Sequence, residues 1–105
     1  MNAAQIILAQ IGGNVFARMT GAKNFVSGTN PNGTPYLMFS IPAASTTNKA
    51  NRVCITLDAS DTYTVTFQSL RSLKLKTISE VSGVYADQLR AVFTSATGLY
   101  TSLRG

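Results

Sequence analysis

Two stretches of strict alternation, joined by a short polar segment, constrain the fold of this chain more than any other feature. In residues 52–57 apolar side chains take every second position, and in residues 62–67 large apolar side chains alternate with threonines. A period of two places one kind of side chain on each face of a strand, which is typical of half-buried strands. Residues 58–61 lie between these stretches and have the polar composition of a hairpin loop. The chain is therefore predicted to form an antiparallel hairpin over residues 52–67.

A helical repeat follows near the end of the chain. Apolar residues spaced i, i+4, i+7, i+8 and i+11 are Tyr85, Leu89, Val92, Phe93 and Ala96. This spacing aligns the side chains on one side of an α-helix, where they can pack against a sheet. Ser82 or Gly83 is expected to precede the helix, and Gly98 is expected to close it.

The first half of the chain has weaker patterns. A short helical stripe at residues 4–11 is expected to end at Gly12 and Gly13, since glycine readily adopts the left-handed conformation that terminates helices. Residues 14–20 show mixed alternation and are predicted to form a strand. Residues 20–35 contain several glycines and prolines and are predicted to form a long loop, interrupted at Lys23-Phe25.

Two further strands and a second loop complete the prediction. Residues 36–41 are apolar at consecutive positions, as in a strand covered on both faces, and Pro42 ends them. Residues 43–51 are small and polar and are predicted to form a loop. In residues 73–76 leucines alternate with lysines, which indicates a strand with a cationic outward face. The predicted fold is α+β: an antiparallel sheet of about four to five strands, with a short N-terminal helix and a C-terminal helix packed on one face.

Length and composition bound the number of domains and the class of partner. A chain of 105 residues suits a single domain over residues 1–105. Nine lysines and arginines against four acidic residues give a net charge of +5, which favours anionic partners. Charged residues make up only 12% of the chain, about half of the usual proportion, so neutral and apolar surface is expected to stay exposed. Such surface favours self-association or a protein partner.

The residue types needed for catalysis or metal binding are scarce. The chain has no histidine, one cysteine and four acidic residues, Asp58, Asp61, Glu80 and Asp87. Turn formation and the dipole of the last helix explain the acidic residues better than general acid or base chemistry does. Cys54 lies within a predicted strand, where packing explains it better than reactivity. We therefore expect no enzymatic activity, no catalytic residue, no metal site and no cofactor.

A basic surface is the best candidate for a binding site. If the apolar residues of the predicted strands face the helices, the lysines of residues 73–76 share the opposite face with the threonines of residues 62–66. Hydroxyl and ammonium groups with an aromatic ring nearby suit single-stranded nucleic acid. The predicted nucleic-acid-binding residues are Lys74, Lys76, Arg52, Arg71 and Tyr36, with Phe16 as an alternative stacking ring. A solvated, threonine-rich face without a partner is the competing interpretation.

A protein interface is the alternative. The chain ends in an apolar tail, in which Leu99, Tyr100 and Leu103 are the predicted interface residues. Together with an exposed sheet edge, this tail suits a homo-oligomer or docking onto another protein. Packing of the tail beside its own last helix is an equally good interpretation.

Several segments resemble a family of small proteins encoded by bacteriophages and prophages. The segments that carry the resemblance include Met19-Thr20-Gly21-Ala22-Lys23-Asn24-Phe25 and Val84-Tyr85-Ala86-Asp87. The resemblance spans nearly the whole chain. It implies a viral origin and a bacterial host cytoplasm, but it assigns no catalytic or binding residue.

The leading hypothesis is a small, non-enzymatic phage accessory protein that binds nucleic acid, single-stranded in particular, through a basic, threonine-rich sheet face. The alternative is a protein-interaction module, either an inhibitor of a host defence protein or a homo-oligomeric viral structural component. The apolar run at residues 6–9 is too short for a signal peptide or a membrane span, so no membrane partner is expected.

Overall fold

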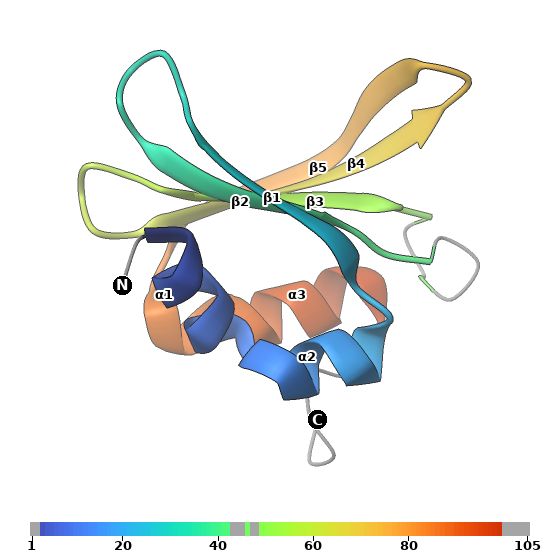
Figure 1. Cartoon of the computed structure of the whole chain (residues 1–105), viewed down its shortest axis with the longest axis horizontal. Coiled ribbons are helices and arrows are strands. Elements are labelled where there is room, and N and C mark those ends of the chain that lie inside the picture. The colour runs from blue at the N-terminus through green and yellow to red at the C-terminus, as the bar shows by residue number, and fades with distance from the viewer. Residues whose placement is uncertain (1–2, 43–45, 47–48, 100–105) are drawn as a thin grey trace.

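The computed structural model describes residues 3–42, 46 and 49–99 of the chain, so the second predicted loop, residues 43–51, lies partly outside the described residues. The described part places one layer of helices against one face of an antiparallel sheet (Figure 1). Its elements in chain order are α1 (Ala3–Ile11), α2 (Gly13–Thr20), β1 (Lys23–Thr29), β2 (Pro35–Ser40), β3 (Arg52–Leu57), β4 (Tyr63–Arg71), β5 (Lys74–Val84), the short 3-10 helix η2 (Ala86–Gln88) and α3 (Leu89–Thr97). The predicted α+β class is confirmed, and α2 is added to the two expected helices.

The sheet is a meander in which each strand pairs with its neighbour in sequence. The strand order is β1-β2-β3-β4-β5, and every pairing is antiparallel. Figure 1 shows α1, α2 and α3 on one face of the sheet, while the tips of the β1–β2 and β4–β5 hairpins rise away from the helices. No helix of the described chain covers the other face, which we call the open face.

The hairpin predicted from the alternating pattern is confirmed. β3 pairs with β4 in a register that places Ile55 opposite Val65, and both side chains are buried against the helices. In the connecting loop the N–H of Asp58 donates to the carbonyl of Thr62 at 2.9 Å. Asp61 takes a positive φ of 63°, a conformation that aspartate tolerates better than most residues.

Four buried phenylalanines join the helix layer to the sheet. Phe16 of α2, Phe39 of β2, Phe67 of β4 and Phe93 of α3 are each no more than 1% exposed. The ring of Phe16 lies 5.2 Å from that of Phe93 and 5.3 Å from that of Phe39, edge-on in both cases. Each edge-to-face pair adds about 0.5–1.5 kcal/mol to the free energy gained by burial. The four rings therefore connect two helices to two strands that are not neighbours in the sheet.

The strand predicted for residues 14–20 is wrong, because this segment forms α2. The hydroxyl of Thr20 donates to the carbonyl of Phe16 at 2.8 Å, one helical turn back, and accepts the N–H of Ala22 at 3.2 Å. Gly21 follows in the left-handed conformation, with φ 74°, and closes the helix. Other apolar side chains of α2 stay exposed, and this exposure made the pattern resemble a weak strand.

The long loop predicted for residues 20–35 is wrong over much of its length, because the interruption expected at Lys23-Phe25 is the start of a full strand, β1, which runs to Thr29. Gly28 lies within this strand, where the ring of Tyr36 in β2 packs over it. Glycine fits at this position, whereas a Cβ atom would collide with that ring. The strand predicted next in the chain is confirmed as β2, but it is not covered on both faces. Leu37 and Phe39 are buried against the helices, while the residues between and beside them lie on the open face.

The last helix is confirmed, although it begins later than predicted. Ser82 and Gly83 lie within β5, and α3 starts at Leu89 after the short helix η2. Gly98 closes α3 in the left-handed conformation, with φ 77°, as the sequence predicts. Tyr85 precedes both helices and is 61% exposed, so the buried stripe begins one turn later.

Truncation of Phe93 tests the packing of the core. Phe93→Ala should lower the free energy of unfolding by about 3–5 kcal/mol, because it leaves a cavity among three other rings. Urea denaturation followed by circular dichroism measures this change. Val15→Ala is the matched control, since Val15 lies on α2 but is 50% exposed, and it should change stability by less than about 0.5 kcal/mol. A loss below about 1 kcal/mol for Phe93→Ala would contradict the packing described here.

Candidate nucleic-acid interface

The end of the β4–β5 hairpin projects beyond the rest of the sheet. β3 pairs with β4 only as far as Gln68, so residues 69–71 of β4 have β5 as their strand neighbour. The two strands join through a two-residue turn at Ser72 and Leu73. Residues 69–76 therefore form a two-stranded extension, visible at the tip of this hairpin in Figure 1 and called the ribbon below.

Asn51 holds the base of the ribbon. Its side-chain amide donates to the carbonyl of Leu70 at 2.9 Å, and its side-chain oxygen accepts the N–H of Leu70 at 2.8 Å. This pair of bonds has the pattern of one further strand residue beyond β3. The ribbon is therefore anchored at its base and free at its tip.

Cationic side chains surround a hollow on one side of the ribbon. The hollow has a volume of about 550 Å³ and is lined by Lys49, Ser69, Arg71, Lys76, Thr77 and Ile78. None of the described residues that line it has a carboxylate side chain. Three like charges around one concave surface raise the local positive potential and attract anions. We call this feature the basic hollow.

Alternation along β4 decides which side chains share this side of the ribbon. Phe67 faces the helices, so Ser69 and Arg71 lie on the same face further along the strand. The register places Lys76 opposite Ser69 and Lys74 opposite Arg71. Because directly opposed residues of an antiparallel pair share a face, the helix side of the ribbon carries all three cations.

Leucines occupy the other face and the tip. Leu70 and Leu75 are opposite each other in the register and are 40% and 53% exposed. Leu73, in the turn, is 98% exposed. The ribbon is thus amphipathic, with a cationic face, a leucine face and a leucine at its end.

The prediction that Lys74 and Lys76 share a face with the threonines is wrong. Neighbouring residues of β4 pair with Thr77 and Ser79 of β5, so Ile78 between them is an extra residue, a β-bulge. The extra residue reverses the alternation of β5 between the bulge and the turn. As a result Leu75, rather than Lys74 and Lys76, lies on the face that carries the threonines of β4. A regular period of two, read from the sequence alone, cannot locate such an insertion.

The open face of the sheet is nearly neutral. Arg52 lies on it and donates from Nε to the Sδ atom of Met38 at 2.9 Å. Glu80 lies on the same face and accepts the hydroxyl of Thr66 at 3.0 Å. Lys23 is paired with Ser40 on this face as well, and Asp58 accepts the hydroxyl of Thr64. Two cations and two carboxylates offset each other, so the face is rich in threonine, as predicted, but it is not basic.

The structure brings together only part of the predicted binding set. Arg71, Lys74 and Lys76 lie together on the ribbon, whereas Arg52 lies on the open face. Tyr36 is half-buried over β1, on a strand separated from β4 by β3. The alternative stacking ring, Phe16, is buried in the core and is not available to a ligand.

Sequence reasoning missed Lys49 and the leucine face of the ribbon. Lys49 lies in a loop, where no periodic pattern predicts its neighbours. The local composition does indicate a basic site, because residues 62–79 contain three cations and no acidic residue. Such an acid-free segment indicates a local positive field even where the face of each side chain is unknown.

Of the predicted interface residues, only Leu99 lies within the described part of the chain. Leu99 is half-buried and packs against the core, and its carbonyl accepts the hydroxyl of Thr94 at 2.9 Å. Leu99 is therefore held by its own domain. Tyr100 and Leu103 lie outside the described residues.

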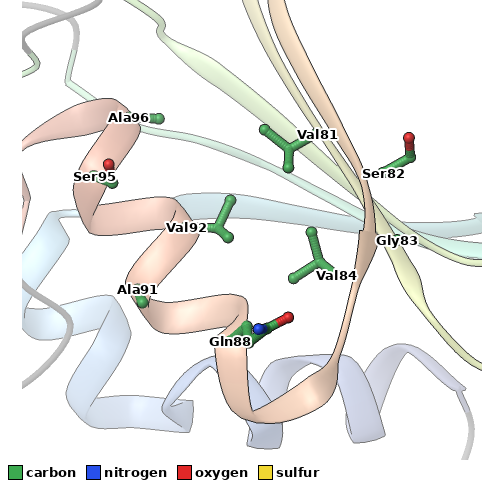
Figure 2. Close-up of a pocket in the computed structure, with 9 residues that line it drawn as sticks. All are labelled: Val81, Ser82, Gly83, Val84, Gln88, Ala91, Val92, Ser95 and Ala96. Atoms are coloured by element: carbon green, nitrogen blue, oxygen red, sulfur yellow. The ribbon is translucent and has the colours of Figure 1, made fainter.

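An apolar groove lies between β5 and α3. Its volume is about 590 Å³, and the lining residues are Val81, Ser82, Gly83, Val84, Gln88, Ala91, Val92, Ser95 and Ala96. Figure 2 shows Val84 of β5 and Val92 of α3 pointing toward each other across it.

Bulges interrupt both edge strands of the sheet, β1 and β5, which hinders direct pairing of these edges with another strand.

Cys54 is half-buried in β3, on the open face. Burial raises the pKa of its thiol above the ordinary value, and this effect outweighs the opposing influences of Thr56 and Arg52.

The described residues contain no cluster of three or more side chains suited to metal binding. None of the helices described is long and apolar enough to cross a bilayer.

Comparison of the chain with protein-family models, with curated proteins and with solved structures finds no match.

The raised pKa of Cys54 predicts slow alkylation. At pH 8 less of the thiol is ionised than in a free cysteine, and the thiolate is the reactive species. Iodoacetamide should therefore modify the native protein several-fold more slowly than the urea-unfolded protein, as measured by intact-mass spectrometry. Equal rates in the two states would show that Cys54 is an accessible, ordinary thiol.

Proposed function

We propose that the protein binds nucleic acid through the cationic face of the ribbon and the adjoining basic hollow. The observation that carries the proposal is the convergence of Lys49, Arg71 and Lys76 on one hollow, with no carboxylate among its described lining residues. Phosphate groups are the ligand that such a surface suits best. When lysine and arginine side chains neutralise phosphates, the counterions condensed on the nucleic acid are released, and this release favours binding.

The spacing of the ribbon supports contact with more than one phosphate. Lys74 and Lys76 are two residues apart on one strand, which separates their backbone positions by about 7 Å. Arg71 lies opposite Lys74 on the other strand. Cations placed at these positions can engage different phosphate groups, and each contact adds about 0.7–0.9 to the slope of log affinity against log salt.

The proposed setting is that of a small, non-enzymatic accessory protein of a bacteriophage, acting in the cytoplasm of the bacterial host. The resemblance to phage and prophage proteins supports this setting. The excess of nine basic over four acidic residues is consistent with an anionic partner.

Charge reversal on the ribbon tests the proposal. Lys74→Glu/Lys76→Glu lowers the net charge by four and should abolish the mobility shift of oligonucleotides at low salt, while the circular dichroism spectrum stays unchanged. Arg18→Glu/Arg90→Glu is the matched control, because it changes the net charge equally at two exposed helix positions away from the ribbon. The control should retain most of the binding. Absence of any shift for the wild type at low salt, or equal loss in both variants, would contradict the proposal.

Protein interaction is a second candidate function, favoured by the apolar groove between β5 and α3. We propose a dimer or larger homo-oligomer as its form, since the chain has few charges to keep subunits apart.

Light scattering tests the oligomer. The mass of the wild type should exceed the 11.2 kDa of one chain, and Ala91→Arg, which introduces a charge into the groove at an exposed helix position, should return it to that value. A mass near 11.2 kDa for the wild type over a wide concentration range would rule the oligomer out.

A further inference from the structure

Leu73 at the tip of the ribbon has no structural explanation. It is 98% exposed, the largest value among the large apolar residues described. Both residues of the turn have positive φ, 50° for Ser72 and 66° for Leu73. Two-residue hairpin turns of this kind favour asparagine and glycine, because a side chain such as leucine is strained there. Leucine therefore stabilises neither the core nor the turn, and an exposed outlier of this kind points to a function.

The surroundings of Leu73 restrict what it can contact. Arg71 and Lys74 directly flank the turn, and Lys76 lies further along on the same face. An apolar tip between cations fits a ligand that has negative charge outside and apolar surface within. Nucleic acids have this arrangement, because phosphates lie on the outside and the stacked faces of the bases lie inside. Proteins that kink duplexes insert an apolar side chain between base steps in this way and hold the flanking backbone with cations.

We propose that Leu73 is a wedge that inserts between adjacent base pairs of double-stranded nucleic acid, while Arg71, Lys74 and Lys76 contact the flanking phosphates. The inference rests on the proposed nucleic-acid binding and names the form of its ligand. A two-stranded ribbon is narrow enough to enter a groove of a duplex.

A duplex suits the ribbon better than the single strand expected from the sequence. Binding of single strands depends on aromatic rings on which bases stack. The ribbon, residues 69–76, has no aromatic residue, and Tyr36 lies two strands away from β4. A leucine at the tip separates stacked base pairs but offers no flat surface for an isolated base.

The size of the apolar tip argues against a membrane surface. Leu70, Leu73 and Leu75 together offer about twelve side-chain carbons, and two of these side chains are only partly exposed. A single myristoyl chain buries more than this and still gives only marginal, reversible membrane binding. Insertion of the tip into a bilayer is therefore the weaker interpretation, and it is an outcome of the test below.

The test measures bending and unstacking of a defined duplex. A duplex with donor and acceptor fluorophores at its ends and 2-aminopurine near its centre should show more energy transfer and brighter 2-aminopurine fluorescence when the wild type binds. Ser72→Asn/Leu73→Gly should lose both signals and weaken binding by about tenfold, the equivalent of one buried leucine contact. This variant supplies the preferred turn residues, so its melting temperature should be at least that of the wild type. Leu73→Met should retain both signals.

The outcomes separate the wedge from the proposed function. If the wild type binds the duplex without either signal, or if the Asn-Gly variant keeps both, the wedge is overturned and nucleic-acid binding stands. If the wild type binds neither duplex nor single strand at low salt, nucleic-acid binding itself is overturned. Leu73-dependent co-sedimentation with vesicles of phosphatidylserine and phosphatidylcholine, without bending of the duplex, would overturn the wedge in favour of a lipid surface.

Discussion

The edge-on contact between Phe16 and Phe93 is the interaction on which the rest of the structure depends. It joins two helices from opposite ends of the chain, and both rings also contact Phe39 of the sheet. Each phenylalanine is followed four residues later by a threonine that donates its hydroxyl to the phenylalanine carbonyl, and then by a left-handed glycine. Two helices with the same C-terminal chemistry thus bring their rings to one point under the centre of the sheet.

The extension of β4 and β5 past the end of β3 is what leaves both faces of the ribbon accessible. The helices bury the inner side chains of the strands, and the sheet needs no support where β4 and β5 extend past β3. A ribbon held at its base by Asn51 can carry exposed leucines and cations without disturbing the core. The proposed binding surface and the packing core therefore lie in different parts of the same hairpin, since Phe67 is buried while Leu73 is solvent-exposed.

Sequence reasoning located the elements that have a single regular period and failed where the period changes. The central hairpin and α3 follow from clean patterns, whereas α2 was mistaken for a strand, although Phe16, Thr20 and Gly21 repeat the spacing of Phe93, Thr97 and Gly98 in the helix that was found. The bulge at Ile78 reversed the predicted face of both lysines, because an inserted residue leaves no mark on composition. Lys49 reaches the basic hollow from a loop, and only tertiary structure brings it there.

The meander order of the sheet has a consequence for how the chain is made. Every strand pairs with the one synthesised just before it, so the sheet can assemble progressively as the chain leaves the ribosome. The contact between Phe16 and Phe93 cannot form until α3 has emerged, after all five strands of the sheet. Until then one side of the aromatic cluster stays exposed to water, so the assembled sheet carries an unfinished core until the last helix docks.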